Sequence, residues 1–178
     1  SAETEQAIRQ KYGLKRPFVM YTGGIDHRKN IEGLIRAYAK LSTDLRKTHQ
    51  LAIVCSALPE SRRNLEQLAA QQGLSKSELI LTGFVPEDDL VALYNLCALF
   101  IFPSWHEGFG LPALEAMRCG APVIGANTSS LPEVIGWEEA LFDPHSDEAM
   151  AWAMEHAISD PIFRGKLVQH GKEQSAKF

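Results

Sequence analysis

The chain has 178 residues, 45% of them hydrophobic, and a formal net charge of −4. This length and composition suffice for one globular domain with a sizeable core, and they argue against intrinsic disorder. The negative charge argues against a broad surface for nucleic acid or an anionic membrane, since both surfaces need clustered Lys and Arg.

Helical and strand-like segments alternate along the chain. Short apolar runs beside Gly or Pro predict buried strands, and apolar residues at helical spacing predict helices. In chain order, the pattern predicts a helix at 2–12, a strand at 17–22, a helix from 31 to 41, a strand at 51–55, a helix at 61–72, a strand at 79–82, a helix at 86–96, a strand at 98–102, a helix from 112 to a stop at 120, a strand at 122–125, a short helix at 131–135, a short strand at 140–142, and helices at 147–159 and from 161 onward.

Residues with known helix-end preferences mark several of these boundaries. Gly13 is expected to end the first helix, Asn30 to cap the second, and Asp160 to cap the last. Pro86 is expected at a first helical position, where its missing N–H costs nothing. The alternation predicts an α/β fold over residues 1–178, a Rossmann-like doubly wound parallel sheet with helices on both faces.

The cysteines and histidines give no sign of a metal centre. Cys55, Cys97 and Cys119 lie in or beside apolar segments without a CxxC pair, which is typical of buried thiols in a reducing compartment. The six histidines show no metal-ligand spacing, so we expect no metal and no other cofactor. The chain begins at Ser1 rather than Met, and we expect it to be a fragment of a longer protein.

Two loops follow strands that should end at the same edge of the sheet. They come after Thr22 and after Phe102. Ligands of doubly wound sheets bind at the carboxyl ends of the strands, so we expect the two loops to share one crevice.

The second loop contains Gly108, Phe109, Gly110 and Leu111, directly before the helix predicted from Pro112. A helix start offers unpaired N–H groups and a positive dipole end, and the glycines let a ligand come close to them. The segment therefore predicts an anion-binding cradle. It is not the dinucleotide fingerprint, because no GxGxxG follows the first strand.

Two acids bracket this cradle, Glu107 just before it and Glu115 about one turn into the helix. A carboxylate accepts hydrogen bonds at two oxygens, so it suits neighbouring hydroxyls of a sugar or a ribose. The alternative is structural: Glu115 pairs with Arg118 at i,i+3, and Glu107 is a solvated loop acid. The spacing alone leaves both readings open.

The first loop carries two adjacent cations, Arg28 and Lys29, after the Gly23-Gly24 turn. At the crevice they would neutralise a diphosphate, although Arg-Lys pairs are also common in ordinary surface loops. Trp105 and Phe109 are candidates for packing on a sugar or base, with core packing as the alternative for each.

Five segments of the chain, in the same order, resemble the retaining nucleotide-sugar glycosyltransferases of family four. They are residues 21–30 (YTGGIDHRKN), 82–85 (TGFV), 107–115 (EGFGLPALE), the following 116–125, and 130–134 (SLPEV). Members of that family have two Rossmann-like domains facing each other in a GT-B fold. The resemblance implies that residues 1–178 form the carboxyl-terminal, donor-binding domain, without the amino-terminal acceptor domain.

The resemblance also implies a role for each matched residue. Lys29, Arg28 and Glu107 would be catalytic, with the two cations on the donor diphosphate and Glu107 on hydroxyls of the transferred sugar. The donor-binding residues would be Glu115 on the ribose, Val85 near the base, and the backbone of Gly23, Gly24, Gly108, Phe109, Gly110 and Leu111. The expected reaction is hexosyl transfer with retention and without a metal, in the biosynthesis of a polysaccharide or glycoconjugate.

One position departs from the family pattern. Many members have Arg after the first glycine of the first loop, where this chain has Gly24. Either Arg28 substitutes for that cation or the diphosphate site is less electropositive. The departure puts the strength of diphosphate binding in doubt and leaves the fold expectation unchanged.

The expected partners are a nucleotide-sugar donor, a sugar, lipid-linked or other acceptor, and the protein's own amino-terminal domain. No nucleic acid and no transmembrane segment are expected. The implied location is cytoplasmic, with the inner face of the membrane as the alternative for the full-length protein. The fragment alone is expected to bind donor weakly and to transfer nothing. The alternatives are a GT-B-type epimerase or phosphorylase, and a non-catalytic nucleotide-binding module.

Overall fold

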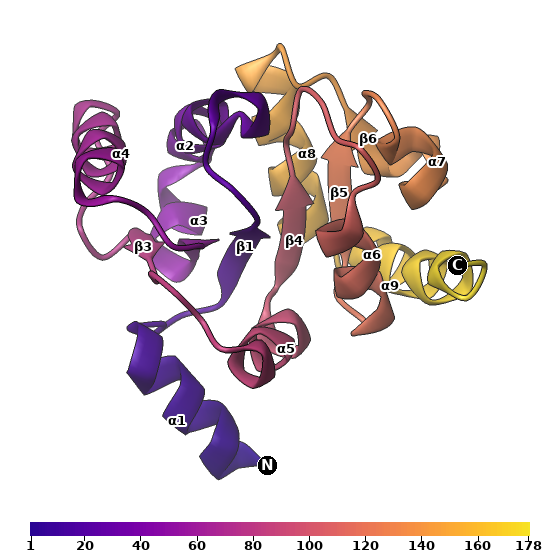
Figure 1. Cartoon of the computed structure of the whole chain (residues 1–178), viewed down its shortest axis with the longest axis horizontal. Helices are drawn as coiled ribbons and strands as arrows, with labels where there is room; N and C mark the ends of the chain where they lie inside the picture. The colour runs from indigo at the N-terminus through magenta and orange to yellow at the C-terminus, as the bar shows by residue number, and fades with distance from the viewer.

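A computed structural model describes residues 1–178 (Figure 1). The helices are α1 (Ala2–Tyr12), α2 (Ile31–Ala39), α3 (Thr43–Thr48), α4 (Pro59–Gln71), α5 (Glu87–Leu96), α6 (Leu111–Arg118), α7 (Leu131–Ile135), α8 (Asp147–Ser159) and α9 (Pro161–Ser175). The strands are β1 (Phe18–Thr22), β2 (Gln50–Val54), β3 (Leu79–Leu81), β4 (Leu99–Phe102), β5 (Val123–Ala126) and β6 (Leu141–Phe142). Short 3₁₀ turns cover His27–Lys29 and Glu138–Ala140.

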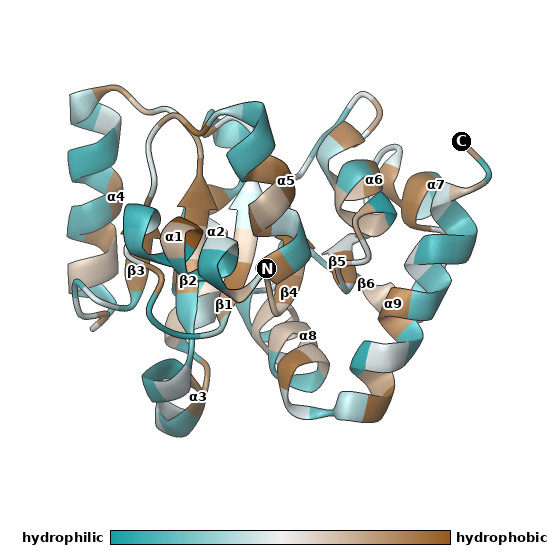
Figure 2. Cartoon of the chain, turned by 90° about the horizontal axis from the view of Figure 1, so that it is seen from below, coloured by the Kyte–Doolittle hydropathy of each residue, from teal (hydrophilic) through white to brown (hydrophobic).

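The six strands form one parallel sheet in the order β3-β2-β1-β4-β5-β6. Helix α2 packs on α4 and α8, whereas α5 packs on α1 and α6. Figure 2 shows α5 and α6 on one side of the sheet and α8 on the other. The expected doubly wound fold is confirmed, and its strand order reverses between β1 and β4, the place where such sheets bind ligands.

The central strands are buried on both faces, because helices cover both. Every residue of β1, β2, β4 and β5 is buried, including Gln50 at the start of β2. The Gln50 amide accepts from the backbone N–H groups of Lys15 and Arg16 and donates to the carbonyls of Gly13 and Ser77. A polar side chain is tolerated there because all its hydrogen bonds are made.

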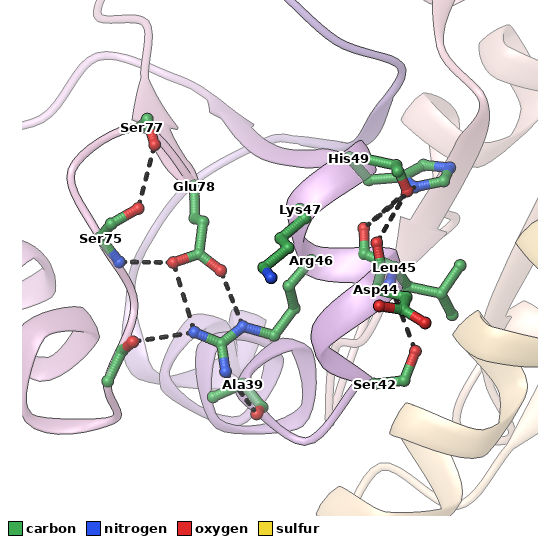
Figure 3. A network of polar contacts seen from close by, with 12 residues as sticks. Ala39, Ser42, Asp44, Leu45, Arg46, Lys47, His49, Ser75, Ser77 and Glu78 are labelled. Carbon is green, nitrogen blue, oxygen red and sulfur yellow. Dashed lines mark hydrogen bonds and ion pairs between the residues drawn. The ribbon is translucent and has the colours of Figure 1, made fainter.

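Figure 3 shows a polar network around Arg46 and Glu78. The network lies at the amino ends of β2 and β3, because α3 leads into β2 and Glu78 directly precedes β3. Arg46 of α3 donates to the buried carboxylate of Glu78 from two nitrogens, at 2.7 and 3.3 Å. The same guanidinium donates to the carbonyl of Gly73, and the Ser75 N–H donates to Glu78. This network fixes α3 against the segment that leads into β3.

Three sequence expectations about helices are corrected first. Helix α3 was not expected, because it is short and polar, with Ser42 as its cap and Arg46 as its anchor. Pro86 precedes α5 and is not its first residue, and Leu41 is buried beyond the end of α2.

Asn30 precedes α2 as expected, but its side chain does not cap the helix. The backbone of Asn30 is in the left-handed conformation, with φ of 60°. Its side-chain amide donates to the carbonyls of Pro103 and Pro144. Of the three cysteines expected to be buried, only Cys97 is; Cys55 and Cys119 are half-buried. No helix is both long enough and apolar enough to cross a membrane.

Candidate functional site

The loops that follow β1 and β4 lie side by side, as expected. The backbone N–H of Trp105 donates to the Arg28 carbonyl at 2.9 Å, and the side-chain amide of Asn30 donates to the Pro103 carbonyl at 3.0 Å. Sequence analysis did not assign Asn30 to this junction, because its bonds cross 73 residues of chain. The two bonds fix both predicted site loops relative to each other.

Lys29 and Glu107 form an ion pair across this junction. The Lys29 Nζ lies 2.6 Å from Glu107 Oε2, and the side chains are 18% and 8% exposed. The interpretation of Glu107 as a solvated loop acid is therefore wrong. The two opposite charges of the pair offset each other, and the ammonium still has two further N–H groups to donate.

Arg28 points to a different partner. Its guanidinium lies 3.2 Å from Asp26 Oδ1 and its side chain is 67% exposed. The hydrogen bond from Arg28 lowers the pKa of Asp26. A Cβ added at Gly24 would lie 3.3 Å from Asp26 Oδ2 and 3.7 Å from Lys29 Cε, so any side chain at this position would begin between these two residues. In this structure Arg28 is thus held by Asp26 and does not join the Lys29–Glu107 pair.

The glycine segment 108–110 leads directly into α6, which has no side-chain N-cap. Gly110 is left-handed with φ of 91°, and an added Cβ there would lie 2.8 Å from Leu131. An added Cβ at Gly108 would meet nothing within 4 Å. The backbone around Phe109 is therefore open to a ligand at the positive end of the helix.

The aromatic neighbours of this segment are partly exposed. Phe109 is 43% exposed, so the alternative of core packing is wrong for it. Trp105 is half-buried, donates to the Pro144 carbonyl at 3.3 Å, and contacts the rings of His27 and His145.

Glu115 does not pair with Arg118. It is exposed on α6 and accepts a hydrogen bond of 3.1 Å from the hydroxyl of Tyr94 on α5. Burial raises the pKa of Tyr94, so its hydroxyl stays protonated and can donate. The carboxylate keeps lone pairs for a second partner.

Val85 lines a pocket of about 340 Å³ at the carboxyl ends of β1 and β2, together with Gly23, Val54 and an exposed Phe84. Its walls are mainly apolar, and Gly23 connects it to the loop of Lys29. A larger hollow of about 540 Å³ lies at β3 and α4, and none of the predicted site residues lines it. The smaller pocket is the better candidate for a nucleobase, because it adjoins the charged groups.

The structure has no group of three or more His, Cys, Asp or Glu side chains that could hold a metal ion. The fold brings the Lys29–Glu107 pair beside the backbone N–H groups at the start of α6, and Glu115 lies further along the same helix. These groups suit an anion and sugar hydroxyls.

Solved structures with a similar fold include glycosyltransferases. Sucrose-phosphate synthase from Thermosynechococcus elongatus superposes with a TM-score of 0.83 and 30% identity, over 97% of this chain and 44% of that chain. The fold is one Rossmann-like domain of the GT-B class. The family described as "Glycosyl transferases group 1" matches residues 4–174, so the chain belongs to the group 1 glycosyltransferases.

Its relatives include two mannosyltransferases of Escherichia coli. The serotype-specific mannosyltransferase WbdA is 50% identical over 178 residues, which are 100% of this chain and 22% of WbdA. The O-antigen chain mannosyltransferase B is 34% identical over 172 residues, which are 96% of this chain and 45% of that protein. The chain therefore spans less than half the length of these relatives.

Proposed function

We propose that the chain binds the nucleotide-sugar donor of a retaining, metal-independent hexosyltransferase and transfers the sugar together with a second, acceptor-binding domain. The relatives support mannose as the transferred sugar. The observation that carries the proposal is the Lys29–Glu107 pair, which lies beside the open start of α6. The family match does not favour the epimerase, the phosphorylase or the non-catalytic module.

The geometry supports a specific division of work. Cleavage of the anomeric bond builds negative charge on the leaving diphosphate and positive charge on the sugar. Lys29 and the N–H groups of Phe109, Gly110 and Leu111 would stabilise the first charge. In comparable oxyanion sites the loss of one such donor costs about 2.7–4 kcal/mol of barrier. Lys29 can donate to a phosphate oxygen without releasing Glu107, because an ammonium has three N–H groups.

The two carboxylates would hold two different sugars. Glu107 is fixed beside Lys29, where a hexose attached to the diphosphate would lie, and Glu115 lies further along α6 beside Tyr94. The pocket at Val85 would take the base. Arg28 would approach the diphosphate only by leaving Asp26, so it is the weakest member of the proposed set.

Binding can be tested on the chain itself by calorimetry with UDP, GDP, ADP and their hexose conjugates. We expect one nucleotide family to bind, and Lys29→Met to weaken its binding about 10- to 100-fold, since a hydrogen bond to a charged group contributes about 1.5–3 kcal/mol. Lys76→Ala removes an exposed lysine far from the site and should change nothing. A folded chain that binds none of these nucleotides would sink the proposal.

Retention and metal independence need the longer protein that contains this chain. Transfer should persist in EDTA, and the product's anomeric configuration, read by NMR, should equal that of the donor. Loss of transfer on chelation, restored by a divalent cation, would contradict the metal-independent part of the proposal.

A further inference from the structure

The loop between β5 and α7 carries three consecutive hydroxyl residues that contact the loop of Glu107. The Ser129 Oγ accepts from the Glu107 N–H at 2.9 Å, and the Ser130 Oγ donates to the Glu107 carbonyl at 3.3 Å. The Thr128 hydroxyl donates to the Ser104 carbonyl at 2.9 Å. We refer to residues 128–130 as the hydroxyl clamp.

The clamp takes up both polar groups of the Glu107 main chain. Glu107 belongs to no helix or strand, so no regular hydrogen-bond ladder fixes its backbone. With its N–H and carbonyl both held, its Cα–Cβ direction is set, and its carboxylate is buried against Lys29. A shift of this backbone would move the carboxylate away from the Lys29 ammonium, which it contacts at 2.6 Å.

The conformation of Ser129 is itself unusual. Its φ is 48°, and Asn30 is the only other residue besides glycines with positive φ. A side chain in this region costs about 1–2 kcal/mol, so the surrounding contacts must maintain it. The conformation places the Ser129 hydroxyl on the Glu107 N–H. Both left-handed residues thus bond to the loop that follows β4, Asn30 at the Pro103 carbonyl and Ser129 at the Glu107 N–H.

The residue that follows the clamp lies against the glycine segment 108–110. Leu131 follows the clamp directly, and its Cδ2 would lie 2.8 Å from a Cβ at Gly110. The β5–α7 loop therefore contacts the site loop at Glu107, and the first residue of α7 lies against Gly110 at the start of α6.

We propose that Ser129, supported by Ser130, is a positioning residue that acts on the transferred sugar through Glu107 and does so without contributing to nucleotide binding. This inference rests on the proposed function. The clamp bonds hold main-chain groups of the residue assigned to the sugar, and Lys29 and Glu115 receive no bond from it. Its loss should therefore separate sugar recognition from diphosphate recognition.

The test compares two affinities measured by calorimetry on this chain, one for the nucleotide sugar and one for the bare nucleoside diphosphate. Ser129→Ala should lower the affinity for the sugar conjugate about fivefold to tenfold, about the effect of one hydrogen bond, and should not lower the affinity for the bare diphosphate. On a Glu107→Gln background the same substitution should have no further effect on their ratio. In the longer protein, kcat should fall by a similar factor with little change in the KM for acceptor.

Matched variants separate the hydroxyl from the backbone and from general stability. Ser129→Gly relieves the left-handed conformation yet removes the hydroxyl, and it should impair sugar recognition as much as Ser129→Ala. In Ser42→Ala a comparable bond is lost, the one that the Ser42 hydroxyl accepts from the Leu45 N–H of α3 at 3.3 Å. This variant should have a lower melting temperature and unchanged affinity for both ligands.

Each outcome separates this inference from the proposed function. If the nucleoside diphosphate binds and Ser129→Ala weakens both ligands equally, the clamp supports the whole site and the positioning role is overturned. An unchanged ratio in Ser129→Ala overturns it as well. If the wild-type chain binds no nucleotide at all, the proposed function fails first, and the positioning role fails with it.

Discussion

Glu107 places a negative charge where the proposed donor brings its own. Its carboxylate lies 2.6 Å from the Lys29 ammonium, so part of the cation's field is already neutralised. A diphosphate must then bind beside a buried carboxylate in a medium where charges a few ångströms apart interact by several tenths to a few kcal/mol. The contacts that Glu107 makes with the sugar would offset this repulsion.

Glu107→Gln should therefore have opposite effects on two ligands. We expect the bare nucleoside diphosphate to bind several-fold more tightly, because the neutral amide neither repels the diphosphate nor offsets the charge of Lys29. The extra affinity that the sugar supplies should fall, and transfer by the longer protein should be lost. Calorimetry with the two ligands measures both effects.

Glu115→Gln is the control for this result, because Glu115 pairs with no cation and is exposed. It should not strengthen binding of the diphosphate. Weaker diphosphate binding by Glu107→Gln would show that the carboxylate organises Lys29 and does not compete with the ligand.

Tyr94 is the only side chain that hydrogen-bonds the Glu115 carboxylate, and it is nearly fully buried. Tyr94→Phe keeps the ring and its packing on Phe100 and removes this one donor. We expect a loss of about threefold to tenfold in affinity for the ribonucleotide, the range for one ordinary hydrogen bond. The 2′-deoxy or the 3′-deoxy nucleotide should bind wild type and variant alike, and an equal loss for all three would contradict a ribose role for Glu115.

Sequence reasoning predicted that the loops after Thr22 and Phe102 lie together, because both follow strands of one parallel sheet. It named Lys29 and Glu107 within these loops from their charge and from the family resemblance, and left a structural alternative open for each. It did not find Ser129 or Tyr94, whose bonds join segments about 20 residues apart that touch only after the helices pack. Nor did it foresee that Arg28 is held by Asp26, because a side chain's choice between two nearby anions depends on loop conformation.

At the scale of elements, the strands were predictable because each contains a short apolar run, and the four central strands β1, β2, β4 and β5 are buried on both faces. Helix α3 was not, since its six residues carry no apolar stripe and it is fixed by tertiary contacts. Arg46 supplies the main contact, with a bidentate pair to a carboxylate that is 11% exposed. This network at the amino ends of the strands has no part in the proposed site.

The network predicts an acid-sensitive contribution to stability. Burial alone would raise the pKa of Glu78, but the hydrogen bonds from Arg46 and Ser75 outweigh it and the pKa is lowered. A carboxyl group with a lowered folded-state pKa stabilises the fold above its unfolded pKa, near 4.5, and this contribution is lost as the pH falls through the folded value. Glu78→Gln should therefore flatten the dependence of unfolding free energy on pH below about 5.

Arg46→Ala should cost about 3 kcal/mol at neutral pH in chemical denaturation, the low end for breaking a buried pair, because it leaves Glu78 unpaired. The exposed i,i+4 pair of Arg62 and Glu66 provides the control. Glu66→Gln should cost about 0.3–0.5 kcal/mol and leave the acid limb unchanged. Equal costs for the two pairs would show that the Glu78 network is as solvent-screened as a surface pair.

At the scale of the whole molecule, one core of 47 buried residues includes side chains from both sides of the sheet. The site loops follow β1, β4 and β5 and all leave the same edge of that sheet, so the core that stabilises the fold also fixes their relative positions. The chain covers 22% of WbdA, and the remaining wall of a donor site would come from residues outside it.

A ligand that binds this edge should therefore stabilise the whole chain. At a ligand concentration of about 100 times Kd, mass action adds about 2.7 kcal/mol to the unfolding free energy. For a domain of this size each kcal/mol raises Tm by roughly 2–4 °C, so the matching nucleoside diphosphate should raise Tm by about 5–10 °C. Lys29→Met, titrated at the same absolute concentration, should lose most of the shift, whereas Lys76→Ala should keep it. A single core requires the ligand-binding carboxyl ends of the strands and the Arg46–Glu78 network at their amino ends to unfold together. A calorimetric scan in which the ligand shifts only part of the unfolding transition would contradict this expectation.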